Sequence, residues 1–452
     1  MIKSKNLHVI EKDDTFYVFH KKFGNLTLMS RREYQLLNNL DLEIENKKEI
    51  LNIFSENYFI NECDKEENEN IELEINNRND ASDGRLLIGL QLIVSNFCNF
   101  NCKYCFLNEE HKLRDNSEKN APSDMKLDVA KKAINFMIEN IKKNGNKILS
   151  IEFFGGEPLM NWRLIKEVLD FYGNGEKSEI AIEYTITTNG SLITNEVIDY
   201  FEKYNVHTII SFDSPNSHER ITKNRKDLNE VLVPIFEKLH HRNITISFNS
   251  VISKYTLENF DYKGLVDISE KYNIQNIGLI LDLDVDLLGK KINLDDIINL
   301  ILKTYYEGRS RGINVTGYWE KMFLQINNQE DLFYEKGYKA CPAVGCKISV
   351  EPSGDIFACK CCPTKIGEID RAQNMLIDNE YREYLDKVYK NSDMCHECEL
   401  EGFCSGVCVG SLEKNGSKYG RNSNLCYVYK KITEELIKGI SRDEISTDIL
   451  QI

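Results

Sequence analysis

The middle of the chain alternates short apolar segments with longer amphipathic ones. Segment 148–156 is rich in aromatic and β-branched residues and ends in glycine, whereas 127–143 repeats apolar residues at helical spacing. This alternation predicts an α/β fold, a parallel sheet with helical crossovers that forms a partial (β/α)6 TIM-like barrel. The expected strands are 86–95, 148–156, 180–190, 206–214, 244–253 and 274–284, and the expected helices are 127–143, 162–173, 196–204, 231–242 and 262–272.

The first 60 residues have a different pattern. Three short alternating segments, 7–12, 15–21 and 26–30, predict strands, and two segments of helical spacing follow them at 30–40 and 47–59. Ser30 is expected to cap the first of these helices. The unit could be a packed subdomain, or a module that binds a peptide along an exposed strand, for which Leu26–Ser30 is our candidate. The acidic stretch 61–84 is interpreted as a linker.

The composition and charge of the chain limit the kinds of partner that it could bind. The 452 residues are 41% hydrophobic and 29% charged, and the net charge of -15 argues against a nucleic-acid partner. No run of about 18 apolar residues could span a membrane. The N-terminal residues lack a signal-peptide core, so we expect a cytoplasmic protein with no membrane partner.

Fourteen cysteines are many for a chain of this kind. Reducing compartments disfavour disulfides, so clustered cysteines there indicate metal ligands or catalytic groups. Cys98, Cys102 and Cys105 follow the first barrel strand, and ten others lie between Cys341 and Cys426. Three thiolates can hold three irons of a four-iron cluster and leave the fourth iron open for a small ligand. A closed zinc site would need a fourth ligand, and it remains an alternative.

The motif C-x3-C-x2-C, with Tyr104 before the third cysteine, resembles the signature of the radical SAM superfamily. The resemblance implies that Cys98, Cys102 and Cys105 are catalytic and hold a [4Fe-4S] cluster, which cleaves S-adenosyl-L-methionine to a 5'-deoxyadenosyl radical. It also implies cofactor contacts at the ends of later strands, where the segments 153–158, 187–190 and 211–215 match family elements. The cofactor-binding residues would be Tyr104, Gly155, Gly156, Glu157, Asn189, Ser211, Asp213 and Arg225, with Arg220 as the competitor of Arg225.

The C-terminal cysteines resemble the SPASM domain, which carries two auxiliary [4Fe-4S] clusters. The matching series is C-x12-G-x4-C, from Cys341 through Gly354 to Cys359, followed by C-x2-C-x5-C-x3-C and a last cysteine. By the family pattern, the first auxiliary cluster is held by Cys341, Cys346, Cys359 and Cys408, and the second by Cys395, Cys398, Cys404 and Cys426. Cys361 or Cys362 could replace Cys346, and a zinc ribbon is the alternative for the second group.

The resemblance implies that the enzyme is a peptide maturase. It implies four regions: residues 1–82, a winged-helix-like leader-peptide recognition domain and linker; 83–320, the barrel; 321–430, a bridge and SPASM domain; and 431–452, a C-terminal helix and tail. The expected partners are a precursor peptide with a leader segment, containing cysteine, and an electron donor of flavodoxin or ferredoxin type. Thioether formation from a cysteine sulfur to a carbon is the expected reaction.

Other functions stay open at this point. Within peptide maturation, they are carbon–carbon crosslinking and epimerisation. Outside it, they are formylglycine formation by an anaerobic sulfatase-maturating enzyme and a non-enzymatic iron–sulfur or zinc sensor. Lys360 stands where the sulfatase maturases place an aspartate, and about 85 residues precede the barrel, which argues against the sulfatase branch.

Overall fold

A computed structural model of the chain gives the fold. It describes residues 1–79, 84–105, 123–176, 178–216, 219–220, 228–282, 293–327, 341, 343, 345–377, 381–385, 397–404, 408, 410 and 423–440.

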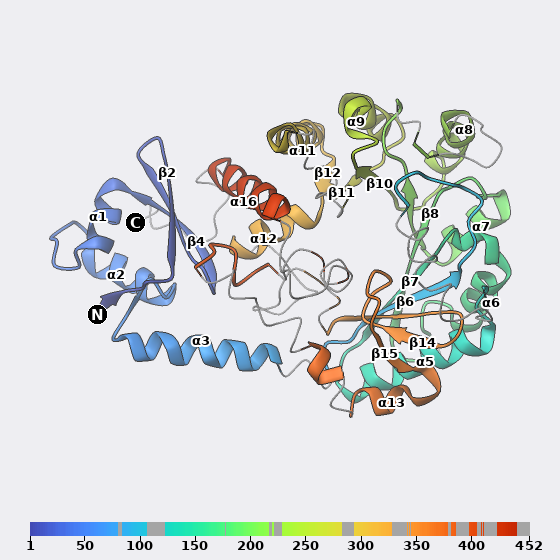
Figure 1. The fold of residues 1–452 in the computed structure, drawn as a ribbon, viewed down its shortest axis with the longest axis horizontal. Helices are drawn as coiled ribbons and strands as arrows, with labels where there is room; N and C mark the ends of the chain where they lie inside the picture. Colours follow the sequence, from blue (N-terminus) through green and yellow to red (C-terminus); the bar gives the residue numbers. More distant parts are fainter. Residues whose placement is uncertain are drawn as a thin grey trace.

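The largest sheet in these described residues has ten strands, in the order β12-β11-β10-β9-β8-β7-β6-β13-β14-β15 (Figure 1). The strands from β6 to β12 pair in parallel, β13 joins β6 in parallel, and β14 and β15 extend that edge antiparallel. Their bounds are β6 Gly89–Ser95, β7 Ile148–Gly155, β8 Ala181–Thr188, β9 His207–Ser211, β10 Ile246–Ile252, β11 Asn276–Leu281, β12 Asn314–Thr316, β13 Lys347–Val350, β14 Asp355–Phe357 and β15 Lys365–Glu368.

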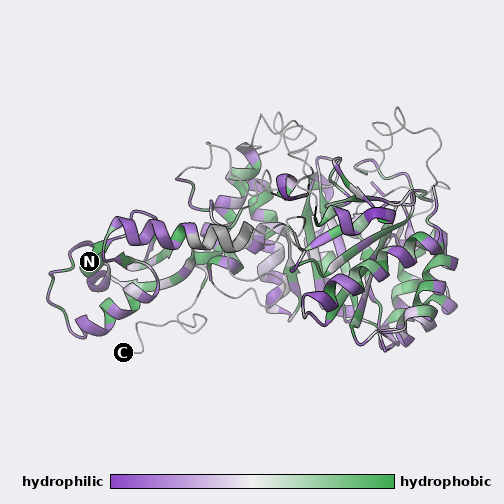
Figure 2. Ribbon diagram, turned by 90° about the horizontal axis from the view of Figure 1, so that it is seen from below, coloured by the Kyte–Doolittle hydropathy of each residue, from purple (hydrophilic) through white to green (hydrophobic). Residues whose placement is uncertain are grey.

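Helical crossovers cover the outer side of this sheet. In Figure 2 they carry hydrophobic and hydrophilic stripes, as amphipathic helices do. The bounds of the crossover helices are α5 Leu127–Lys143, α6 Trp162–Tyr172, α7 Asn195–Lys203, α8 Leu228–His240, α9 Tyr262–Lys271 and α11 Leu294–Ser310. The helices that follow them in the described chain are α12 Tyr318–Ile326, α13 Ala372–Met375 and α16 Ser423–Lys438. In the described part of the chain, no helix is long and apolar enough to cross a bilayer.

The structure confirms the α/β class, and the six expected barrel strands are β6 to β11. The expected helices correspond to α5 to α9. The sequence pattern missed β12 because a strand of three residues is too short to show a period.

The two faces of the sheet differ in chemistry. On β6, Leu90, Leu92 and Val94 are buried in the apolar core, whereas Gln91 lies on the opposite face beside Glu152 of β7. Because neighbouring strands pair in register, the same alternation of apolar and polar faces continues across the sheet. The helix-covered face is therefore apolar, and the inner face of the partial barrel carries polar groups.

The N-terminal unit is built as the sequence predicts. A three-stranded sheet has the order β2-β3-β4, and Ser30 caps α1 in a capping box with Glu33. The bounds are β1 Ile2–Lys3, β2 Leu7–Lys12, β3 Thr15–His20, β4 Gly24–Ser30, α1 Arg31–Asn38, α2 Lys47–Glu56, β5 Ile60–Asn61 and α3 Asp64–Asn79.

Both faces of this small sheet are covered. Phe16, Val18 and Met29 pack in a cluster with α1 and α2. Phe19 and Leu28 instead belong to the main core, which also contains residues of α12 and α16 (Figure 1). The N-terminal unit therefore shares its core with the rest of the chain.

Our candidate docking strand is wrong on this evidence. Leu26–Ser30 is buried in β4 up to Met29, and the beginning of β4 contacts the end of α12. The exposed edge lies on the other side of the sheet, where Glu11 and Lys12 of β2 face solvent. The alternation of apolar and polar residues predicts that a strand forms. It does not predict which edge of the sheet another element covers.

The acidic stretch 61–84, interpreted as a linker, contains helix α3, Asp64–Asn79, which runs from the N-terminal unit towards the barrel (Figure 1). Asp64, Glu66 and Glu67 lie in its first turn, where the helix dipole favours negative charge. Glu67 turns inward and is 4% exposed. It accepts hydrogen bonds from Ser4 Oγ at 2.5 Å and from Asn6 Nδ2 at 2.7 Å, and it pairs with His20 Nε2 at 3.3 Å.

Acid is expected to loosen the N-terminal unit in two steps. Burial lowers the pKa of His20 despite its contact with Glu67, so stability falls as the pH drops below the ordinary value of 6.5. Burial alone would raise the pKa of Glu67, but hydrogen bonds from His20, Ser4 and Asn6 outweigh it and lower the pKa to about 2. Its contribution, at most about 3 kcal/mol, is present above pH 4.5 and is lost as the pH falls towards 2.

Hydrogen exchange of residues 1–79, corrected for intrinsic rates, should show both steps. His20→Asn is the matched control, since it keeps an acceptor near the position of Nδ1 but does not titrate. The variant should lose the upper step and keep the lower one. Exchange that is flat from pH 7 to pH 5 in the natural chain would contradict this account.

Candidate active site

The three cysteines of the first motif lie in the loop that follows β6. Cys98, Cys102 and Cys105 are half-buried free thiols. The amide of Phe100 donates to Cys98 Sγ at 3.3 Å, and the amide of Cys105 donates to the carbonyl of Cys102 at 3.2 Å. The loop is thus held by its own backbone at the carboxyl end of the sheet, where parallel barrels carry their chemistry.

A glycine turn at the end of β7 packs directly on this loop. The amide of Gly156 donates to the carbonyl of Ser95 at 2.8 Å, and that of Glu157 donates to the carbonyl of Phe97 at 2.7 Å. A Cβ at Gly155 would lie 2.1 Å from the oxygen of Ser95, and one at Gly156 would lie 2.3 Å from that of Phe97. Only glycines permit this approach, as the sequence predicted from the turn.

Glu157 is 1% exposed and ties three segments together. Its Oε1 accepts hydrogen bonds from the amide of Leu159 at 3.0 Å and from Thr188 Oγ1 at 2.7 Å. Its Oε2 accepts one from the amide of Asn189 at 2.7 Å. Burial raises the pKa of Glu157 to about 7, against these hydrogen bonds, which lower it.

Asn189 links the end of β8 to the cysteine loop. Its Nδ2 donates to Asn99 Oδ1 at 2.8 Å and lies 4.0 Å from Cys98 Sγ. Its Oδ1 accepts from Ser191 Oγ at 2.6 Å. The Glu157 carboxylate therefore orients the backbone of a residue whose side chain reaches the first cysteine.

A second polar cluster joins β9 to the other side of the loop. Asp213, which is 1% exposed, pairs with Arg220 through Nε and Nη2, each at 3.2 Å. The Tyr104 hydroxyl donates to the same carboxylate, and the Arg220 guanidinium lies 5.4 Å from the Tyr104 ring centre. The Asp213 charge raises the pKa of Arg220, although burial alone would lower it.

The arginine that meets Asp213 is thus Arg220, the competitor in our prediction. Arg225 lies outside the described residues. Ser211 ends β9 opposite Asn249 of β10, and it follows Ile210, which pairs with Thr188 of β8. This places Ser211 at the same edge as Asn189.

Sequence reasoning missed a partly buried charged cluster on the inner face of the barrel, formed by Gln91, Glu152, Thr187, Lys347 and Lys360. Glu152 accepts from Gln91 Nε2 at 2.7 Å and pairs with Lys347 Nζ at 3.2 Å. Burial would raise the pKa of Glu152, but Lys347 and Lys360 together outweigh it and lower the pKa to about 2. Polar residues in the middle of strands expected to be apolar on both faces were the available signal.

Lys360 connects this cluster to the C-terminal cysteines. Its amide donates to Gln91 Oε1 at 3.1 Å, and its Nζ lies 3.1 Å from the ring centre of Phe154. Phe154 directly precedes the glycine turn, and Cys359 directly precedes Lys360. The inner-face cluster thus lies between the first cysteine motif and the C-terminal cysteines.

Two of the cysteines assigned to the first auxiliary group, Cys359 and Cys408, interact with Cys361. A hydrogen bond from Cys361 lowers the pKa of Cys359 to about 5, and nearby Lys347 acts in the same direction against burial. Cys361 also interacts with Cys408, and a Cβ at Gly410 would lie 2.0 Å from its carbonyl oxygen. Cys346 and Cys362 are both buried, and Cys362 belongs to the main apolar core.

The second group gathers beside α16. Burial raises the pKa of Tyr429, and the charges of Cys404, Cys408 and Cys426 act in the same direction. Cys398 interacts with Cys404. Cys395 lies outside the described residues.

These residues fit the groups implied by the first motif. No disulfide joins the cysteines in the described ranges, so their sulfurs remain available as ligands. A carboxylate has about four lone pairs, so Glu157 retains an acceptor for an ammonium donor.

Comparisons with known proteins also indicate a radical SAM enzyme. Residues 92–261 match the Radical SAM superfamily. The radical SAM cyclopropyl synthase TigE of Paramaledivibacter caminithermalis is 37% identical over 471 aligned positions, which cover 98% of this chain and 98% of the relative. A cysteine-type anaerobic sulfatase-maturating enzyme of Clostridium novyi is 21% identical, over 77% of this chain and 94% of that enzyme.

Among solved structures, SuiB of Streptococcus suis, determined with S-adenosylmethionine and with the precursor peptide SuiA, superposes with a TM-score of 0.56. The superposition covers 94% of this chain and 99% of SuiB at 17% identity, which shows a shared fold.

Glu157→Gln should lower both stability and cofactor affinity. An amide has one acceptor oxygen, so at least one buried N–H or O–H loses its partner, at about 1–3 kcal/mol. Thermal unfolding should show the loss, and calorimetry on the folded fraction should show weaker binding of S-adenosylmethionine. Glu167→Gln on the exposed face of α6 is the control and should change neither. Unchanged affinity in the Glu157 variant would reject its role at the cofactor.

Asp213→Asn should destabilise the cysteine loop strongly. It leaves the Arg220 guanidinium buried with no counter-charge, which typically costs about 3–5 kcal/mol. The exposed pair of Arg242 and Asp199 gives the comparison, where Asp199→Asn should cost at most about 1 kcal/mol. Chemical unfolding of the two variants measures the difference. Equal costs would show that the buried pair does not support the loop.

Proposed function

The chain belongs to the radical SAM superfamily, and from this membership we propose that the enzyme closes a cyclopropane ring within a residue of a ribosomally made precursor peptide. One observation carries the proposal: the similarity to the cyclopropyl synthase TigE extends over 98% of both chains. It therefore includes the N-terminal unit, the barrel and the C-terminal cysteines together. The sulfatase-maturating relative is less similar and matches less of the chain.

The cofactors we propose are S-adenosyl-L-methionine and three [4Fe-4S] clusters. Cys98, Cys102 and Cys105 would hold the first cluster. The others would be held by Cys341, Cys346, Cys359 and Cys408, and by Cys395, Cys398, Cys404 and Cys426, with Cys361 as a further thiol at the first of these sites. When bound, S-adenosylmethionine at the first cluster supplies a radical that takes a hydrogen atom from the peptide, and the auxiliary clusters supply one-electron acceptors.

In this proposal, the protein's own residues bind the cofactor and hold the cysteine loop in place. Glu157 would accept from the methionine ammonium while it holds the backbone of Asn189 in place. Asp213 would fix Arg220 and Tyr104 beside the cysteine loop. The inner-face cluster supplies charges between the radical site and the auxiliary cysteines, and it would position the peptide there.

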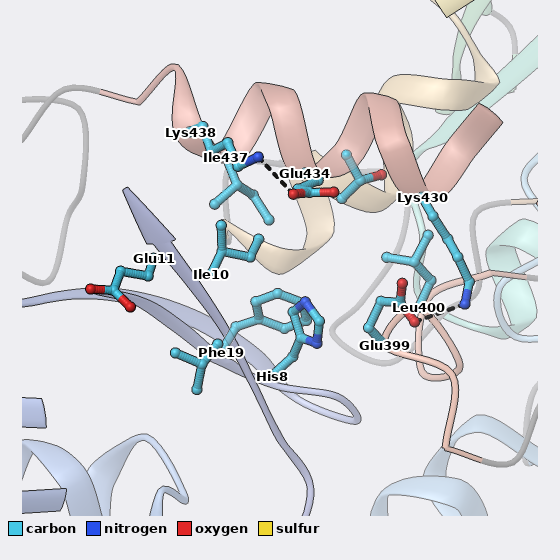
Figure 3. Close-up of a pocket in the computed structure, with 12 residues that line it drawn as sticks. His8, Ile10, Glu11, Phe19, Glu399, Leu400, Lys430, Glu434, Ile437 and Lys438 are labelled. Atoms are coloured by element: carbon cyan, nitrogen blue, oxygen red, sulfur yellow. Dashed lines mark hydrogen bonds and ion pairs between the residues drawn. The ribbon is translucent and has the colours of Figure 1, made fainter. Parts of the chain in front are cut away.

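We place leader-peptide docking on β2. A cavity of about 290 Å³ lies between this edge strand and α16 (Figure 3). Ile10, Phe19 and Ile437 contribute apolar surface, while Glu399 pairs with Lys430 at 2.9 Å on one side. An extended peptide could add along β2 and place alternate side chains in this cavity. The electron donor would be a flavodoxin or a ferredoxin.

The test is anaerobic incubation with the short peptide encoded beside the enzyme's gene. Ring closure removes two hydrogen atoms: one appears in 5'-deoxyadenosine, and the other leaves as a proton and an electron. The peptide mass should fall accordingly, and shielded cyclopropane protons should appear in its NMR spectrum. A variant with Cys98, Cys102 and Cys105 changed to Ala should form neither product.

Alkylation distinguishes the alternatives. A thioether bond removes the same two hydrogens but also consumes a thiol, so iodoacetamide would label one cysteine fewer. A crosslink between two side chains would appear in fragmentation spectra, and epimerisation would leave the mass unchanged in water. Any of these products, with no cyclopropane signal, would replace the ring-closing proposal.

A further inference from the structure

The turn between β3 and β4 of the N-terminal unit contacts the loop that contains Cys398 and Cys404. The amide of Gly402 donates to the carbonyl of Lys21 at 3.1 Å. Lys22 Nζ pairs with Glu401 Oε2 at 2.7 Å, and both side chains are mostly buried. These contacts join segments almost 400 positions apart in the sequence.

The contact requires a glycine in the cysteine loop. A Cβ at Gly402 would lie 2.5 Å from the oxygen of Lys21 and 2.8 Å from the Cα of Lys22. Both are backbone atoms, which cannot move aside as a flexible side chain can. The loop and the turn are therefore packed backbone against backbone.

The turn is rigid on its own side. His20 Nδ1 accepts hydrogen bonds from the amides of Lys22 at 3.1 Å and Phe23 at 3.3 Å. Its Nε2 faces Glu67 of α3 at 3.3 Å. With Nδ1 as the acceptor, Nε2 carries the proton and donates to Glu67. Helix α3 thus fixes the ring that shapes the turn.

The cysteine loop depends on the residues that receive this contact. The amide of Glu401 donates to the carbonyl of Cys398 at 3.1 Å, and the amide of Cys404 donates to the carbonyl of Leu400 at 2.9 Å. Glu401 and Gly402 therefore lie within the hydrogen-bonded turn that sets the separation of the two cysteines. Lys430 of α16 anchors the neighbouring Glu399 from the other side.

We propose that the N-terminal unit is a structural part of the second auxiliary iron–sulfur site. Through Lys21 and Lys22 it holds the loop of Cys398 and Cys404 in the conformation that binds the cluster. Lys22 and Gly402 are positioning residues, since neither supplies a ligand. The inference rests on the proposed assignment of the auxiliary clusters, and it means that the unit proposed to dock the peptide also supports a redox centre.

The experiment uses the full chain with Cys98, Cys102 and Cys105 changed to Ala, so that only auxiliary iron is counted. This parent should hold about eight irons, and adding Gly402→Ala should reduce the content to about four, with loss of one reduced-cluster EPR signal. Gly367→Ala is the matched control, because its Cβ would meet only the Met375 side chain, at 3.3 Å or more. It should retain all the iron.

Exchanging the charges of Lys22 and Glu401 tests the contact between the turn and the cysteine loop without adding steric strain. Lys22→Glu should weaken retention of the second auxiliary cluster against a chelator, and the double variant Lys22→Glu, Glu401→Lys should restore it. Full iron and both EPR signals in Gly402→Ala and Lys22→Glu would overturn the bracing role. A parent that binds no iron would instead overturn the cluster assignment itself, so the two failures are distinguishable.

Discussion

The active site depends on one close approach, that of the glycine turn after β7 to the cysteine loop after β6. Two backbone hydrogen bonds close it, from Gly156 to Ser95 and from Glu157 to Phe97. Because no side chain separates the two backbones, Glu157 lies deep enough to reach the end of β8. Asn189 is then drawn towards Cys98, and the site forms from three successive strand ends.

The parallel sheet brings these two strand ends together. It also separates apolar residues on one face from polar residues on the other. Its outer face is apolar and is covered by helices, which provides the core. Its inner face carries Glu152, Lys347 and Gln91, whose charges and hydrogen bonds are satisfied within the barrel. Such a cluster costs desolvation that only mutual pairing offsets. It lies between the two sets of cysteines.

The N-terminal unit is joined to the catalytic part through several contacts. Its sheet packs on α12 and α16, its β3–β4 turn packs on the loop of Cys398, and Glu67 of α3 holds the histidine that shapes this turn. The cavity beside β2 is lined by residues of the same cysteine loop, Glu399 and Leu400. The cavity proposed for peptide docking and the loop of Cys398 are therefore neighbours in space, although the first 60 residues resemble a separate module in sequence.

The sequence by itself determined the elements whose signals are local. Alternating strand and helix periods placed β6 to β11 and their crossovers, and Ser30 marked the start of α1. Cysteine spacing and the glycine turn located the loop after β6. Contacts between distant segments were decided only by the tertiary structure. Arg220 meets Asp213, β4 packs against α12, and Glu67 of α3 turns inward to Ser4, Asn6 and His20. Each of these outcomes depends on which surface another part of the chain covers, and a sequence period carries no information about that.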